Sequence, residues 1–262
     1  MIINDSAVKG KSSVSNSNAR VKFVSLFKIT EERQVGDYSI KFYSDNLLDS
    51  LNGDLIKLAE CYVKVFSESW GETWTIDDAI AKIKKDLEPT KTRTPIMSIL
   101  FDKEGEIKGF AWGILTDCED IQATDVPFSF TRNEQEKACV IARYWFLTVK
   151  KKKVLIFSEI GIRNDVHGHL ATYLVQPMTS FALSQGFTSM FYWTSTKSRA
   201  FQLGVMVGWS PFHYFGDTKD LVLMGAANLE YSNSIIVGMA ESKKPPNNYK
   251  ECRQNFIKYF GQ

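Results

Sequence analysis

Two histidines flank a glycine at His167, Gly168 and His169, where a buried strand gives way to a helix in the stretch VLIFSEIGIRNDVHGHLATYLV, residues 154–175. The start of a helix presents unpaired backbone N–H groups at the positive end of the helix dipole, and phosphate binds readily there. A protonated imidazole would add a further donor. The backbone from His167 to Thr172 therefore predicts an anion site.

Two other interpretations of the HGH sequence stay open. It is a solvated turn without a ligand, or the two imidazoles are part of a metal site. Because the sequence offers no third ligand nearby, the metal site is the least favoured of the three, and we predict that the protein holds no metal.

Around this junction, the spacing of hydrophobic residues alternates between the pattern typical of strands and the pattern typical of helices. Strands are predicted at 38–43, in a hairpin at 95–116, and at 154–162, 187–193, 209–215 and 221–226; helices are predicted at 54–66, 75–87, 133–149, 168–185 and 198–207. Thr75 with Asp78, and Thr131 with Glu134, are spaced as helix-capping pairs. This order predicts an α+β or α/β fold with a mixed, mostly antiparallel central sheet flanked by helices, and one parallel pair where a helix crosses between strands.

The composition is that of an ordinary globular protein. Of 262 residues, 44% are hydrophobic and 24% are charged. The net charge of +2 is too small to predict a nucleic-acid or membrane partner, and no apolar run approaches the roughly 20 residues that span a bilayer. The four cysteines form no CxxC pair, which favours free thiols in a reducing, cytoplasmic compartment.

Several motifs, taken in order, resemble the GNAT superfamily of acyl-CoA-dependent N-acetyltransferases. EIGI at 159–162 and VHGHLA at 166–171 resemble the strand end and the R-G-x-G-I-G loop of that family. Lys197, Ala200, Leu203, Gly204 and the pair Gly208–Trp209 resemble its N-x-x-A-x-x-L-Y-x-x-x-G-F pattern. ECYVKVFSESWGETWT at 60–75 and GFAWG at 109–113 resemble the front half of many members, so the resemblance covers about residues 38–226.

The sequence is expected to divide into three parts. A disordered polar tail is expected at 1–22, a GNAT-like acetyltransferase domain at 23–230 with a helical insertion at about 117–150, and an extension at 231–262 that ends in a short helix.

The resemblance also implies acetyl-CoA as co-substrate. A strand that splays from its neighbour leaves backbone groups unpaired, and the two amides of a pantetheine arm can pair with Ile160, Gly161 and Ile162 as an added strand. We expect Gly161 to let the arm approach closely. The pyrophosphate is expected on the loop that lacks the family's leading arginine and one of its glycines, formed by Val166, His167, Gly168, His169, Leu170, Ala171 and Thr172.

The implied reaction transfers an acetyl group from acetyl-CoA to the primary amine of an unidentified acceptor. Glu159 is the expected general base, because a carboxylate in a half-buried cleft can have a pKa near neutrality. A structural role for Glu159 is the alternative, and the other candidate bases are Asp117, Glu119, His213 and Tyr214. A backbone N–H near Ile162 is expected to polarise the thioester carbonyl.

Two features leave the functional prediction open. Gly204 stands where the family often has a tyrosine acid, and the phosphate loop is degraded, so the alternative is a non-catalytic acyl-CoA-binding or regulatory module with the same fold. A set of aromatic residues lines an acceptor groove or simply belongs to the core: Trp70, Trp74, Trp112, Tyr192 and Trp193.

Overall fold

The computed structural model describes residues 31–51, 53–126, 131–215 and 220–242. These residues form one sheet with the strand order β1-β2-β3-β4-β5-β6-β8-β7, in which every neighbouring pair is antiparallel except β5 with β6. The strands are β1 (Glu31–Val35), β2 (Tyr38–Tyr43), β3 (Arg93–Asp102), β4 (Ile107–Asp117), β5 (Lys153–Ile162), β6 (Ser189–Ser195), β7 (Ser210–Phe215) and β8 (Leu221–Ala226).

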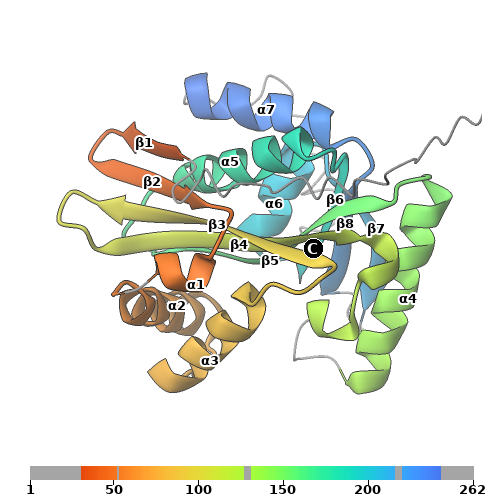
Figure 1. Ribbon diagram of the computed structural model, residues 1–262, viewed down its shortest axis with the longest axis horizontal. Coiled ribbons are helices and arrows are strands. Elements are labelled where there is room, and N and C mark those ends of the chain that lie inside the picture. The colour runs from red at the N-terminus through yellow and green to blue at the C-terminus, as the bar shows by residue number, and fades with distance from the viewer. Residues whose placement is uncertain (1–30, 52, 127–130, 216–219, 243–262) are drawn as a thin grey trace, which may run out of the picture.

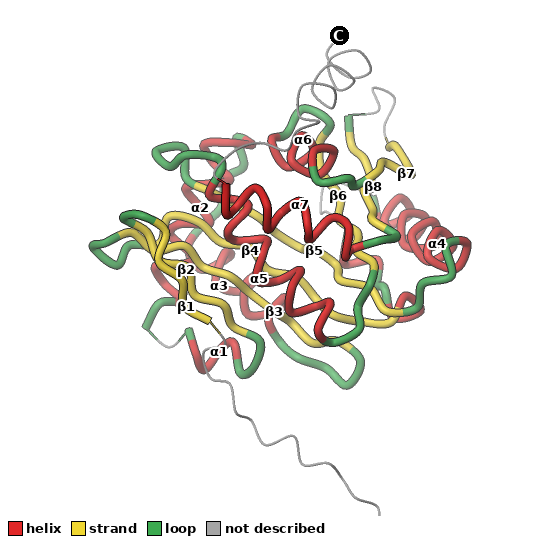
Figure 2. Tube along the Cα trace, turned by 90° about the horizontal axis from the view of Figure 1, so that it is seen from above, coloured by secondary structure: helices red, strands yellow, loops and turns green. Residues whose placement is uncertain are grey.

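Helices cover both faces of this sheet (Figure 1). One face carries α1 (Leu47–Ser50), α2 (Leu55–Trp70) and α3 (Ile76–Leu87), and the other carries α5 (Leu170–Ser184), α6 (Arg199–Met206) and α7 (Leu229–Ser242). Figure 2 shows α5 and α7 side by side over the strands. The helix α4 (Arg132–Thr148) packs at the far end of the sheet through Phe146, which contacts the cluster of Ile114, Ile156 and Phe191.

The predicted fold class is confirmed, and so are both helix starts. The Thr75 side chain accepts a hydrogen bond from the Asp78 backbone at 3.1 Å, and Thr131 with Glu134 forms a reciprocal capping box. Each cap satisfies backbone N–H groups that the first helical turn leaves unpaired.

Several elements go beyond the sequence prediction, among them the short helix α1. β1 extends the sheet by one strand, and α7 spans the boundary expected between residues 230 and 231. The buried side chains Leu229, Ile236 and Ala240 of α7 join the same core cluster as α5. The short helix expected near 249–260 and the tail expected at 1–22 lie outside the described residues.

The parallel pair β5–β6 is short, and this opens the sheet. The two strands pair only where Val154–Ile156 lies beside Ser189–Phe191, although β5 runs on to Ile162 and β6 to Ser195. Beyond Ile156 the edges of the two strands are therefore available to another partner. Within the described ranges, none of the helices has the length and apolar character that a membrane span requires.

Candidate active site

The end of β5 lines two cavities. The α5 cleft has a volume of about 1040 Å³ and is lined by the end of β5, the loop that starts α5, and α6; it includes Ile160, Gly161 and Ile162. The α3 cleft has a volume of about 640 Å³ and is lined by α2, α3, β3 and β6; it includes Ser158 and Glu159. Consecutive residues of one strand, Glu159 and Ile160, thus face different cavities.

A β-bulge at Ser158 produces this change of face. Gly113 of β4 lies opposite Phe157, but the next residue, Trp112, lies opposite Glu159, so Ser158 is an extra residue in β5. Side chains alternate along a strand, and one extra residue reverses the faces of all that follow. Without the bulge, Glu159 would share the core face of Phe157 beneath α5. With it, Glu159 joins Trp112 on the face of α2 and α3.

Glu159 is buried among polar groups in the α3 cleft. Its Oε1 lies 3.1 Å from Nζ of Lys82, and the two side chains are only 10% and 13% exposed. Burial raises the pKa of Glu159 to about 7, the ammonium of Lys82 opposes that rise, and Asp86 adds to it. The Tyr62 hydroxyl hydrogen-bonds to Glu159 and stays protonated, because burial raises the pKa of this phenol well above its usual value. At neutral pH the Glu159 carboxyl can therefore both hold and release a proton.

The loop before α5 lies at the other end of the α5 cleft. His167, Gly168, His169, Ala171 and Thr172 line this cleft. The backbone N–H groups of Leu170, Ala171 and Thr172 bond to the carbonyls of His167, Gly168 and His169 at 3.0–3.2 Å, so a tight turn already engages them. Val166 and the Leu170 side chain are buried in the core under α5 instead.

The two imidazoles of this loop contact one another. Nδ1 of His167 lies 2.6 Å from Nδ1 of His169 and also accepts from the His169 backbone N–H at 3.3 Å. That pattern makes His167 Nδ1 the acceptor and His169 Nδ1 the donor. The pair fixes the orientation of both rings at the mouth of the α5 cleft. Among the residues that the structure describes, no group of three or more His, Cys, Asp and Glu side chains is placed to hold a metal.

No protein-family model matches the chain, and no curated protein matches it in sequence. Among solved structures, the chain is similar to spermidine N-acetyltransferase from Vibrio cholerae in complex with CoA and spermine, with 11% identity, coverage of 73% of this chain and 97% of that chain, and a TM-score of 0.45. An aminoglycoside 6'-acetyltransferase type Ii has 13% identity, coverage of 72% and 96%, and a TM-score of 0.46. A mosquito arylalkylamine N-acetyltransferase like 5b has 11% identity, coverage of 71% and 99%, and a TM-score of 0.49.

These likenesses concern the fold. The mixed sheet, its one parallel pair and the flanking helices are those that the order of elements in the sequence predicts.

Gly161, the glycine of the GNAT-like EIGI strand, has a packing reason. A Cβ there would lie 2.6 Å from Cζ of Phe110 and 2.8 Å from Cγ1 of Val65, closer than real Cβ atoms approach. The core on the α2 side thus already excludes a side chain at position 161. Packing alone explains the glycine, without the expected close approach of a ligand.

Packing also explains Gly204, which stands where the family that the sequence resembles often has a tyrosine. A Cβ at this position would overlap the Tyr192 hydroxyl and lie 3.0 Å from Cε3 of Trp209. The Tyr192 hydroxyl is buried and donates to the Ala200 carbonyl at 2.9 Å. The space next to α6 is thus filled by a phenol that comes from β6 and is engaged with backbone.

We expect Gly204→Ala to lower the free energy of unfolding by about 1–3 kcal/mol, because it overpacks a full site. Tyr192→Phe alone should cost about 0.5–1.5 kcal/mol for the lost hydrogen bond, and the double variant should cost less than the sum of the two. Gly238→Ala in α7 is the matched control, since nothing lies within 4 Å of its Cβ position; it should stabilise by up to about 1 kcal/mol. Urea unfolding measures all four proteins, and additive costs would contradict the overlap.

The other sequence candidates divide between the α3 cleft, the core and the surface. Trp74 and Trp193 line the α3 cleft, while Trp112 and Tyr192 are buried; the side chain of Trp70 lies outside the described part. The remaining candidate bases line neither cavity: Asp117 and Glu119 are exposed at the end of β4, and His213 and Tyr214 lie on β7.

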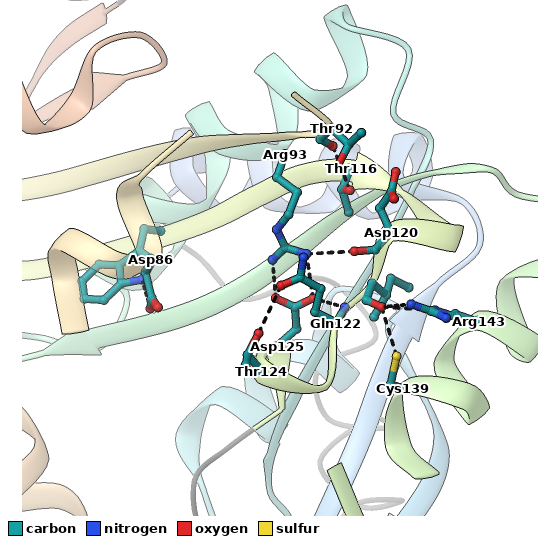
Figure 3. Close-up of polar contacts among 12 residues, drawn as sticks. Asp86, Thr92, Arg93, Thr116, Asp120, Gln122, Thr124, Asp125, Cys139 and Arg143 are labelled. Atoms are coloured by element: carbon teal, nitrogen blue, oxygen red, sulfur yellow. Dashed lines mark hydrogen bonds and ion pairs between the residues drawn. The ribbon is translucent and has the colours of Figure 1, made fainter. Parts of the chain in front are cut away.

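Sequence reasoning missed the ion pair at the far side of the α3 cleft. Arg93 of β3 donates to both carboxylate oxygens of Asp125, at 3.0 Å for Nη1, and also to the Asp120 carbonyl at 3.0 Å (Figure 3). The Gln122 backbone N–H donates to the same carboxylate at 2.7 Å, and Arg143 and Cys139 of α4 donate to the Ile121 carbonyl. These bonds fix the two short 3-10 turns η1 (Cys118–Asp120) and η2 (Ala123–Asp125) between β4 and α4.

Proposed function

We propose that this protein transfers an acetyl group from acetyl-CoA to a primary amine. The observation that carries the proposal is the bulge at Ser158. Because of it, the Glu159 carboxyl, whose pKa burial raises to about 7, lies in the α3 cleft, and the open strand edge of Ile160–Ile162 lies in the α5 cleft. A proton acceptor and an edge for a pantetheine arm are then adjacent along one strand.

The backbone of β5 has the polarity that such an arm needs. The Arg163 N–H bonds to the Lys108 carbonyl of β4 at 3.0 Å. Because backbone groups alternate in direction along a strand, the N–H groups of Ile160 and Ile162 point to the opposite side, where β6 has diverged. One of these donors is suited to the thioester carbonyl and the other to a pantetheine amide.

The chemistry assigned to Glu159 is proton removal. Its carboxylate takes a proton from the acceptor's ammonium, and the neutral amine attacks the thioester carbonyl. The new C–N bond forms as the C–S bond breaks, and the thiolate leaves with the electron pair. A thiol with a pKa near 8.5 is an acceptable leaving group without a dedicated acid, which suits a site whose Gly204 position holds only packed core. The nitrogen that has attacked releases its surplus proton to water, water protonates the thiolate, and the proton on Glu159 is released to solvent before the next turnover.

The lining of the α3 cleft favours a cationic acceptor. Its aromatic walls include Trp74 and Trp193, and its carboxylates outnumber its cationic side chains; these charged residues are Glu72, Asp86, Glu88, Asp125 and Glu159 against Lys82, Lys85 and Arg93. An ammonium is attracted by such a field and by aromatic faces. Buried thiols at Cys61, Cys118 and Cys139 suit a reducing compartment such as the cytoplasm.

The deciding experiment combines binding with turnover. Acetyl-CoA is titrated in a calorimeter, and thiol release is then followed with a panel of primary amines. Binding followed by amine-dependent thiol release supports the proposal. Binding without release with any amine points to the acyl-CoA-binding module instead, and the absence of binding rejects both.

We expect Gly168→Asp to weaken acetyl-CoA binding about tenfold or more, because it adds a negative charge beside the proposed pyrophosphate position. The backbone tolerates the change, since nothing lies within 4 Å of the Gly168 Cβ position. Gly168→Asn is the isosteric neutral control and should stay within about threefold of the parent. Calorimetry and the ligand-induced rise in Tm report the affinities. Equal weakening by Asp and Asn would indicate a steric effect, and no weakening by either would place the phosphates elsewhere.

A further inference from the structure

The side chain of Lys82 lies between two carboxylates of the α3 cleft. Its Nζ is 3.1 Å from Oε1 of Glu159 and is also hydrogen-bonded to Oδ2 of Asp86, one helical turn further along α3. Only 13% of the Lys82 side chain, 10% of Glu159 and 16% of Asp86 is exposed. A buried ammonium in this position acts on both carboxylates at short range.

A third element anchors the network. The indole N–H of Trp112 on β4 donates to Asp86 Oδ2 at 3.0 Å. Trp112 is fully buried and lies opposite Glu159 in the β4–β5 register. Asp86 is therefore held in place by β4, and it holds the Lys82 ammonium in turn. These bonds keep the Lys82 ammonium beside Asp86 and restrict its movement toward Glu159.

The charges of the network do not cancel. Two carboxylates share one ammonium, so the group carries a net charge of −1 when all three are ionised. Tyr62 of α2, which stays neutral, and Glu72, which follows α2, also act on Glu159. The cationic side chains of Lys85 and Arg93 line the same cleft. The positive charge nearest to Glu159 in this network is thus Lys82, and its negative competitor is Asp86.

We propose that Lys82 is a positioning residue whose ammonium pairs with the carboxylates of both Glu159 and Asp86. This shared pairing sets how readily Glu159 takes up a proton from the acceptor. This assignment rests on the proposed function for its catalytic meaning. Its electrostatic part can be tested without turnover, because two residues of α3 change the proton affinity of Glu159 in opposite directions. Lys82 favours the Glu159 carboxylate, and Asp86 disfavours it both by repulsion and by drawing the ammonium away.

The test is a titration of Glu159 in the full-length protein with the side-chain carboxyl carbon of glutamate labelled for NMR, assigned by comparison with Glu159→Gln. Lys82→Met should raise the titration midpoint by about 1 pH unit or more, since an opposite charge at this range shifts a carboxyl by that amount. Asp86→Asn, which retains an acceptor for Trp112, should lower the midpoint. Lys82→Arg keeps the charge and should restore a midpoint close to that of the parent.

Opposite shifts in the two variants support the proposal, because a general loss of structure would not move the midpoint in two directions. Shifts of the same sign, or none, overturn it. If Lys82→Met does not fold, Asp86→Asn decides alone: a lowered midpoint supports the division of the ammonium, and an unchanged or raised one overturns it. With an active amine, the acidic limb of the kcat/KM profile should move as the midpoint does. Opposite NMR shifts without such movement would retain the network and reject Glu159 as the base.

Discussion

Replacing Glu159 with glutamine should lower kcat by about 10²–10⁴-fold with the best amine acceptor, because the variant keeps the shape of the side chain but cannot accept a proton. The affinity for acetyl-CoA should stay nearly unchanged, since Glu159 faces the α3 cleft and the open edge at Ile160–Ile162 faces the α5 cleft. Steady-state kinetics and calorimetry measure the two quantities separately.

The pH dependence gives a second readout of the same variant. Burial, the largest cause, raises the pKa of Glu159 to about 7, so the carboxyl is protonated below this pH and ionised above it. A base acts in its ionised form, and the parent's kcat/KM should therefore rise as the pH increases through about 7. Glu159→Gln should lose the inflection near pH 7 and show a low rate that rises with pH only as the acceptor ammonium itself loses its proton, whose pKa is about 10 for a lysine-like amine.

Glu119→Gln is the matched control for this experiment. Glu119 is an exposed carboxylate outside both cavities, and it is a candidate base by sequence alone. Its replacement should leave kcat and the acidic limb unchanged. A loss of rate in Glu119→Gln together with a normal rate in Glu159→Gln would remove Glu159 from the mechanism.

The fold could be predicted from sequence because its signals are local. Helix caps such as Thr75 with Asp78 act over three positions, and the hairpin of β3 and β4 follows from one short turn. The sequence did not predict α7 because Leu229–Ser242 contains three serines, an asparagine and a glycine that blur the apolar period, and its burial depends on α5. β1 was missed because its sequence, EERQV, has the polar composition of an edge strand.

The active-site proposal depended on contacts that sequence does not encode locally. Glu159 could be proposed from its place before a strand end, but its partner Lys82 comes from a helix far earlier in the chain. Lys82 and Asp86 are four residues apart, a spacing that indicates an ion pair on one helix. The spacing does not indicate which strand this pair faces. The bulge at Ser158 leaves no mark in composition or period, yet it decides which cavity Glu159 enters.

Breaking the ion pair of Arg93 with Asp125 should lower the free energy of unfolding more than breaking any other ion pair described. Their side chains are 9% and 4% exposed, so water cannot solvate either charge when its partner is removed. Arg93→Met should lower the free energy of unfolding by about 3–5 kcal/mol, because it leaves the Asp125 carboxylate buried without its cation. It also removes the donor to the Asp120 carbonyl.

The double variant Arg93→Met, Asp125→Leu separates the value of the pair from the cost of breaking it. With both charges gone, no buried ion is left unpaired, and most of the lost stability should return. The exposed pair Arg132–Glu136, with side chains 91% and 58% exposed, is the control, and Arg132→Met should cost less than about 1 kcal/mol. Urea unfolding measures each variant. A double variant as unstable as Arg93→Met would show that the guanidinium stabilises η1 and η2 mainly through the Asp120 carbonyl, and not by neutralising Asp125.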